Sequence, residues 1–130
     1  MPSRVKKPQP LRVLIADDHR LFAEALEAIL TADERIEVVG QASDGEQAVE
    51  LARRLGPDVV LMDVSMPVLD GFEATREIKE ESGGVRVLML TGSNSRADVD
   101  RSREAGASGY VTKDRIASEL VATIVEVTRH

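Results

Sequence analysis

Hydrophobic positions along the chain follow two alternating patterns. Short, mostly apolar runs rich in Val, Ile and Leu are typical of β-strands, and they occupy residues 11–16, 36–40, 58–62, 85–90 and 107–112. Longer stretches between and after them place apolar residues at helical spacing, which predicts helices over 19–30, 45–55, 71–80, 95–105 and 115–128. Every predicted strand is therefore followed by a predicted helix.

Strict alternation of strands and helices predicts an α/β fold with a doubly wound parallel sheet. The strands are close to continuously apolar, which is typical of strands that helices cover on both faces. The number of units suits the flavodoxin-like (βα)5 arrangement, a three-layer α/β/α fold with strand order 2-1-3-4-5. In that arrangement ligands bind at the carboxyl ends of the strands, so candidate chemistry is sought there.

Composition excludes several kinds of site. The chain has 130 residues, enough for one domain with its own core, and it contains no cysteine, which excludes disulfides and thiolate chemistry. His19 and His130 are too few and too far apart in sequence for a histidine-rich metal centre. The chain contains neither an apolar run of about 20 residues nor a signal-peptide pattern, so we expect a cytoplasmic location without membrane contact.

Charge is distributed unevenly. The net charge is −6, and Arg4, Lys6 and Lys7 give residues 1–10 a charge of +3, so the remaining residues carry −9. We expect residues 1–10 to form a flexible basic tail and residues 11–130 to form the folded domain. An acidic body with few aromatic residues argues against nucleic-acid binding by this chain itself.

Polar residues follow the predicted strands at the edge where ligands are expected. They are Asp17 and Asp18 after the first strand, Asp63 after the third, Thr91 after the fourth and Lys113 after the fifth. Taken singly, some have ordinary structural explanations: Asp18 as a helix N-cap, Thr91 as a turn residue and Lys113 as a solvated surface lysine. Asp63 is harder to explain in this way, because it follows an apolar run where burial penalises a charge.

Together these residues predict chemistry on a phosphoryl group. Carboxylates brought together repel one another, and an all-oxygen set of ligands suits a hard cation such as Mg²⁺, which also binds phosphate oxygens. A lysine and a hydroxyl facing that ion suit a bound phosphoryl group.

The chain resembles the receiver domain of two-component response regulators over essentially all of residues 11–128. The residues that carry the resemblance are VLIADDH at 13–19, DVSMPVLDG at 63–71, LTG at 90–92 and AGASGYVTK at 105–113. The first and last of these segments are most similar to the NarL/FixJ (LuxR-type) subgroup, whose members usually carry a C-terminal helix-turn-helix domain.

The resemblance implies a role for each site residue. Asp63 would accept a phosphoryl group from a sensor histidine kinase, and Lys113 and Thr91 would contact that group. The implied ligands of Mg²⁺, or of Mn²⁺ in its place, are Asp18, Asp63 and the backbone carbonyl of Ser65, with Asp17 acting through a water. Tyr110 would follow Thr91 on activation, although a half-buried strand tyrosine is an alternative. The domain would be a signalling domain that assists its own phosphorylation rather than an enzyme.

Other functions fit the sequence less well. An aspartate-nucleophile phosphatase of the haloacid-dehalogenase type expects a second Asp at position 65, where this chain has Ser65. A dinucleotide-binding enzyme needs a glycine-rich loop after the first strand, which is missing. A pseudo-receiver used only for contacts is disfavoured because the acids, Thr91 and Lys113 are all present. A stand-alone receiver in a phosphorelay remains an alternative to the regulatory domain of a transcription factor.

The only indication of a partner surface is a few apolar residues predicted to lie outside the core faces of their helices. We expect Ala25 and Ala117 to face the core, and Leu21, Val125 and Val127 to lie outside the core face. The latter set would be available for a phosphorylation-dependent homodimer, although isolated exposed aliphatic residues are common. We expect specific DNA binding only through a helix-turn-helix domain that this chain lacks.

Overall fold

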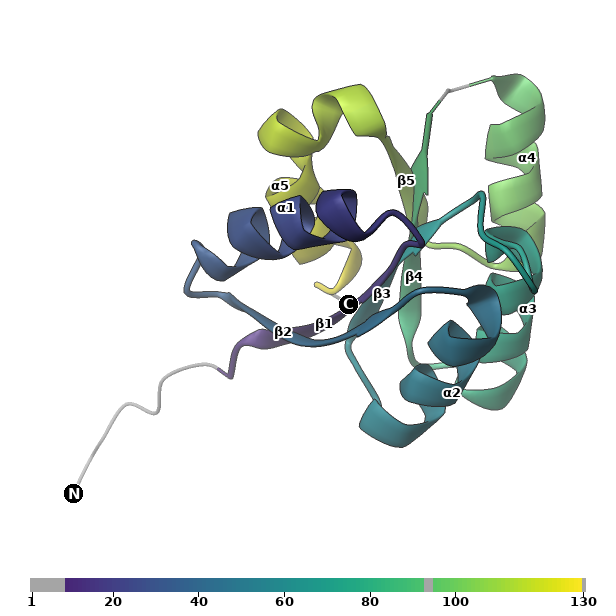
Figure 1. Ribbon diagram of the computed structural model, residues 1–130, viewed down its shortest axis with the longest axis horizontal. Coiled ribbons are helices and arrows are strands. Elements are labelled where there is room, and N and C mark those ends of the chain that lie inside the picture. Colours follow the sequence, from purple (N-terminus) through teal and green to yellow (C-terminus); the bar gives the residue numbers. More distant parts are fainter. Residues whose placement is uncertain (1–8, 93–94, 130) are drawn as a thin grey trace.

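The computed structural model describes residues 9–92 and 95–129, and it contains one parallel sheet in the order β2-β1-β3-β4-β5 (Figure 1). The strands are β1 (Leu11–Ala16), β2 (Ile36–Ala42), β3 (Val59–Asp63), β4 (Arg86–Thr91) and β5 (Gly109–Thr112). The helices are α1 (Arg20–Thr31), α2 (Gly45–Leu55), α3 (Gly71–Glu81), α4 (Arg96–Ala105), the 3₁₀ helix η1 (Lys113–Arg115) and α5 (Ile116–Val127). The predicted fold and strand order are confirmed. The basic residues of the predicted tail lie outside the described residues.

Helices cover both faces of the sheet, with α1 and α5 on one side and α2, α3 and α4 on the other (Figure 1). Successive strand residues point to opposite faces, so Val60 packs in the cluster beneath α2 and α3, whereas Val59 and Leu61 pack beneath α1 and α5. All five residues of β3 are buried. This explains why the strand sequence is continuously apolar until Asp63.

Arg12 fixes the amino-terminal end of the sheet. Its backbone N–H donates to Oδ2 of Asp58 at 2.8 Å, and its guanidinium donates to the carbonyls of Leu55 and Gly56 at 2.8 and 3.0 Å. Gly56 ends α2 in the left-handed conformation, with φ of 55°. One residue of β1 therefore joins the end of α2 to the start of β3.

Some helix faces differ from those predicted. Ala25 and Ala117 are exposed, and Ala23 takes the core position in α1 beside Leu26 and Leu30. Val127 was expected outside the core face, but it packs against the cluster beneath α1 and α5. The prediction for Leu21 is confirmed, since it is highly exposed. Within the described ranges, no helix combines the length and apolar character needed to cross a membrane.

Candidate functional site

The carboxyl-terminal edge of the sheet gathers the candidate residues. Asp17 directly follows β1, Asp63 is the last residue of β3, and Thr91 ends β4. Thr91 lies opposite Thr112 in the β4–β5 pairing, and Lys113 comes next along the chain. The parallel register therefore carries these side chains to a single edge.

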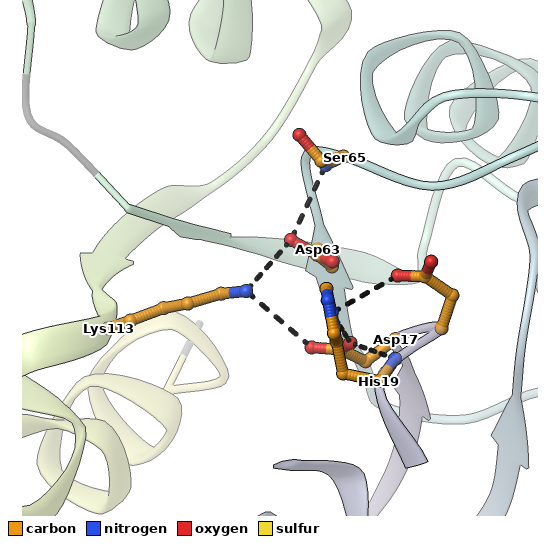
Figure 2. A network of polar contacts seen from close by, with 6 residues as sticks. Asp17, His19, Asp63, Ser65 and Lys113 are labelled. Carbon is orange, nitrogen blue, oxygen red and sulfur yellow. Dashed lines mark hydrogen bonds and ion pairs between the residues drawn. The ribbon is translucent and has the colours of Figure 1, made fainter. Parts of the chain in front are cut away.

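Lys113 pairs with two buried carboxylates. Its Nζ lies 3.3 Å from Oδ1 of Asp63 and 3.9 Å from Oδ2 of Asp17 (Figure 2). The side chains of Asp17 and Asp63 are 0% and 1% exposed, whereas that of Lys113 is 29% exposed. One ammonium group therefore faces two carboxylates that water reaches poorly.

Asp18 and His19 complete the cluster on the α1 side. Oδ1 of Asp17 accepts the backbone N–H of His19 at 2.8 Å, and Nδ1 of His19 lies 3.3 Å from that oxygen and 3.4 Å from Oδ1 of Asp18. The N-cap position of α1 is occupied by His19, without a side-chain cap bond. The alternative in which Asp18 caps this helix is therefore wrong, and its carboxylate lies with the other acids.

The acidic cluster holds more negative charge than Lys113 balances. Oδ2 of Asp17 and Oδ2 of Asp63 are buried and accept no hydrogen bond from the described residues. Burial, and next the Asp17 carboxylate, raise the pKa of Asp63, while Lys113 and the N–H of Ser65 oppose that shift. Unpartnered buried carboxylate oxygens are costly. Their presence fits a site built for a hard divalent cation.

The β3–α3 loop is held against the end of β3 by glycines. The N–H of Gly71 donates to the carbonyl of Val64 at 3.1 Å, and a Cβ at Gly71 would overlap the carbonyl oxygen of Asp63. A Cβ at Gly45 would likewise overlap the carbonyl oxygen of Leu69. Side chains at these two positions would displace the loop that follows the candidate phosphoacceptor.

A tight turn occupies the middle of the same loop. The N–H of Leu69 donates to the carbonyl of Pro67 at 2.8 Å, and Val68 between them has φ of 70°. A β-branched residue with positive φ is strained. Earlier in the loop, the N–H of Ser65 lies 3.4 Å from Oδ1 of Asp63, so its backbone borders the site (Figure 2).

Thr91 and Tyr110 lie on neighbouring strands but in different surroundings. Thr91 is buried at the end of β4. Tyr110 is 39% exposed, pairs in register with Met89, and lines a pocket of about 150 Å³ with residues of α4. The structure therefore places Thr91 at the acidic edge and Tyr110 on the surface beside α4.

Sequence reasoning assigned no site role to His19 or Phe22. Phe22 was explained by the apolar stripe of α1, yet its ring centroid also lies 4.8 Å from Nζ of Lys113. His19 lies two residues after Asp17, at the entrance to α1, where a turn directs its side chain back to the acids. For His19 the available signal is its position immediately after two candidate ligands, Asp17 and Asp18, whereas Phe22 lies three residues further on and has no such signal.

Comparisons with known proteins agree with this geometry. The family description "Response regulator receiver domain" matches residues 13–125. The transcriptional regulatory protein DegU of Brevibacillus brevis is 39% identical over 92% of this chain and 50% of its own length. The nitrate/nitrite response regulator NarL of Escherichia coli K12 is 34% identical over 89% of this chain and 54% of its own.

Solved structures show the same likeness. The signal receiver domain of NarL from Mycobacterium tuberculosis superposes with a TM-score of 0.90 at 33% identity, covering 94% of this chain and 98% of that chain. The response regulator domain of CheB from Thermotoga maritima gives a TM-score of 0.89 at 32% identity, covering 94% and 98%. The chain belongs to the response regulator receiver domain family, the signalling domain of two-component systems.

Proposed function

We propose that this domain is switched by phosphorylation of Asp63, with a sensor histidine kinase as the donor and Mg²⁺ as the cofactor. The observation that carries the proposal is the position of Asp63. Its carboxylate ends a fully buried strand, with Oδ1 facing Lys113 at 3.3 Å and Oδ2 without a hydrogen-bond partner among the described residues. A carboxylate at the edge of a sheet, with one oxygen facing a lysine, can act as a nucleophile when a phosphoryl donor enters the site.

The transfer follows from the groups around that oxygen. An oxygen of Asp63 attacks phosphorus in line, a P–O bond forms, and the bond between phosphorus and the histidine nitrogen of the donor breaks. Lys113 pairs with an oxygen of the incoming phosphoryl group, and the Thr91 hydroxyl donates to another. The product is an aspartyl phosphate at the end of β3.

Asp17, Asp18 and Asp63 would hold the metal together with the backbone carbonyl of Ser65, and Mn²⁺ could replace Mg²⁺. When bound, the ion neutralises charge on the transferring oxygens. A chain of the CheX–CheY–BeF3–Mg²⁺ complex from Borrelia burgdorferi is 27% identical to this chain, with a TM-score of 0.84 over 92% of it and 90% of its own length. That likeness supports magnesium as the ion.

Phosphorylation would change the conformation of Thr91, then of Tyr110, and then of α4. Helix α4 buries only Ser102 and Ala105, so few apolar contacts hold it in place. The added charge at Asp63 would draw Thr91 toward the phosphoryl group, and Tyr110 beside α4 would change position with it. The surface formed by α4 and β5 would therefore change on phosphorylation.

The response that phosphorylation controls is inferred from the curated relatives. The chain spans about half the length of the curated relatives it matches, and several of those are named as transcriptional regulatory proteins. In a longer protein of that kind, a helix-turn-helix domain would bind DNA, and the receiver would form a homodimer on phosphorylation. Comparing sedimentation of the phosphorylated and unphosphorylated domain tests the second part, and an unchanged coefficient at high concentration contradicts it.

Mass spectrometry tests the central proposal. Incubation with acetyl phosphate and Mg²⁺ should add the mass of one phosphoryl group to the wild-type chain and none to Asp63→Asn. Asp114→Asn is the matched control, because Asp114 is an exposed acid next to Lys113 and should leave incorporation intact. Incorporation that persists in Asp63→Asn would contradict the assignment.

A further inference from the structure

His19 is positioned as a fourth member of the acidic cluster. One potential ligand atom from each of Asp17, Asp18, His19 and Asp63 lies within 4.8 Å of all the others. The ring of His19 is 67% exposed, so it lies at the mouth of the site rather than in the core. Its Nδ1 is directed toward the carboxylates, as Figure 2 shows.

A hydrogen bond between His19 and Asp17 does not by itself explain why the His19 ring lies beside the carboxylates. Oδ1 of Asp17 already accepts the backbone N–H of His19 at 2.8 Å, so it does not depend on the imidazole for a partner. The Oδ2 atoms of Asp17 and Asp63 have no hydrogen-bond partner among the described residues, although both side chains are almost fully buried. Apart from the 3.9 Å ion pair between Lys113 and Oδ2 of Asp17, neither oxygen is satisfied by a described residue, and this favours a bound cation independently of His19.

The spacing of the four groups is close to that of a first coordination shell. Ligands on opposite sides of an ion, each about 2.1 Å from it, lie about 4.2 Å apart. The observed limit of 4.8 Å needs only a small rotation of side chains to reach that value. The His19 side chain makes no cap bond with α1, and its ring nitrogen already lies 3.3 and 3.4 Å from carboxylate oxygens of Asp17 and Asp18, the groups that would share the ion with it.

We propose that His19 supplies an imidazole nitrogen to the ion held by Asp17, Asp18 and Asp63, so that this site prefers a first-row transition ion to Mg²⁺. The inference deepens the proposed function and rests on the same metal site. Magnesium favours oxygen ligands, whereas imidazole raises affinity for ions such as Mn²⁺ and, more strongly, Co²⁺. The site would therefore contain three carboxylates, the backbone carbonyl of Ser65 and one imidazole nitrogen.

The histidine content of the chain makes a direct test possible. His19 and His130 are the only histidines, and the chain has no cysteine. Pulsed electron paramagnetic resonance of the Mn²⁺-loaded protein should show the nuclear modulation of a directly bound imidazole nitrogen. The modulation should vanish in His19→Phe, which keeps a ring but removes both nitrogens, and persist in the matched control His130→Phe.

Calorimetry gives a second readout. We expect the ratio of Co²⁺ to Mg²⁺ affinity to fall at least tenfold in His19→Phe and to change less than twofold in His130→Phe. Using the ratio cancels a general disturbance of the site, because such a disturbance weakens both ions. If His19→Phe does not fold, ¹⁵N-histidine labelling of His130→Phe assigns the nitrogen coupling to His19 without altering that residue.

Each outcome decides the inference. Nitrogen coupling that is absent, that persists in His19→Phe, or that depends on His130 overturns it, as does an unchanged affinity ratio. Phosphorylation of the wild-type chain with Mg²⁺ is measured separately. Its absence would contradict the proposed function, while the coupling and the affinity ratio would still report on His19.

Discussion

The ammonium nitrogen of Lys113 lies 4.8 Å from the centroid of the Phe22 ring while also lying 3.3 Å from Oδ1 of Asp63. A cation over an aromatic face is attracted to it by about 0.5–1 kcal/mol at a partly exposed site. Phe22 is half-buried in α1 and packs against the core cluster beneath that helix. The core cluster therefore holds the Phe22 ring in place, and the ring restricts where the Lys113 ammonium can lie.

Replacing Phe22 with Leu should slow phosphorylation of Asp63. The substitution keeps an apolar side chain but removes the aromatic face, and about 0.5–1 kcal/mol corresponds to a roughly two- to fivefold lower rate with acetyl phosphate. Phe22→Tyr keeps the face and should restore the rate. Equal rates in all three proteins would show that the ring does not position Lys113.

Divalent metal should stabilise the fold. An ion that binds only the folded chain adds about 1.4 kcal/mol to the free energy of unfolding when it is present at ten times its Kd. Differential scanning calorimetry should therefore show Tm rising by about 4–6 °C between EDTA and Mg²⁺ at ten times its Kd. Asp18→Ala should lose most of that rise, and a full rise in this variant would remove Asp18 from the ligand set.

Without metal, Asp63 should make stability depend on pH. Burial, together with Asp17, raises the pKa of the folded carboxyl above its ordinary value of 3.8, so the folded chain holds this proton more tightly than the unfolded chain does. The free energy of unfolding contributed by Asp63 therefore falls as pH rises from about 3.8 through the raised pKa.

Urea unfolding of the wild-type chain and Asp63→Asn in EDTA measures this contribution. The stability of the variant relative to the wild type should increase with pH across that window, since only the wild type has a carboxyl at position 63 that deprotonates there. A difference that stays constant with pH would contradict the raised pKa.

Gly45→Ala should disturb the loop that follows Asp63. The new Cβ would overlap the carbonyl oxygen of Leu69, so either α2 or the β3–α3 loop must move. We expect a loss of about 1–3 kcal/mol in unfolding free energy, together with slower phosphorylation. Gly84→Ala is the control, because its Cβ would meet nothing within 4 Å and should leave both quantities nearly unchanged.

This chain alone should not bind DNA with sequence specificity. Residues 11–130 carry all 23 acidic side chains, and the basic residues Arg4, Lys6 and Lys7 lie outside the described structure. Titration against duplex DNA at physiological salt should show at most weak, salt-sensitive attraction. Submicromolar, sequence-dependent binding by the isolated chain would contradict the proposal that DNA binding belongs to another domain.

The fold was predictable because periodicity changes sharply between strand and helix. What could not be predicted is which small residues of a helix face the sheet, because their apolar character does not fix how the helix is rotated about its axis. Ala23 and Ala25 look alike in sequence, yet only packing against the sheet decides that Ala23 is buried. Likewise Val127 was predicted to lie outside the core face of α5, but it packs against the core cluster beneath α1 and α5.

The acids of the site were predictable from the strand ends, because a parallel sheet brings those ends to one edge. His19 and Phe22 were not, since their contribution depends on side-chain direction at the start of α1. The contact between Phe22 and Lys113 joins residues far apart in the chain. Hydrophobic periodicity does not indicate contacts of this kind, and the apolar stripe of α1 already explained the presence of Phe22.

The hydrogen bonds of Arg12 have a consequence for the opposite end of the sheet. They join β1 to the start of β3, and from there the two strands run in unbroken register from Val13 opposite Val59 to Ala16 opposite Met62. Asp17 and Asp63 are the next residues on each strand, so their backbones cannot slide relative to one another. An ion held at the proposed site would therefore be accommodated by turning side chains on a fixed backbone frame rather than by movement of the strands.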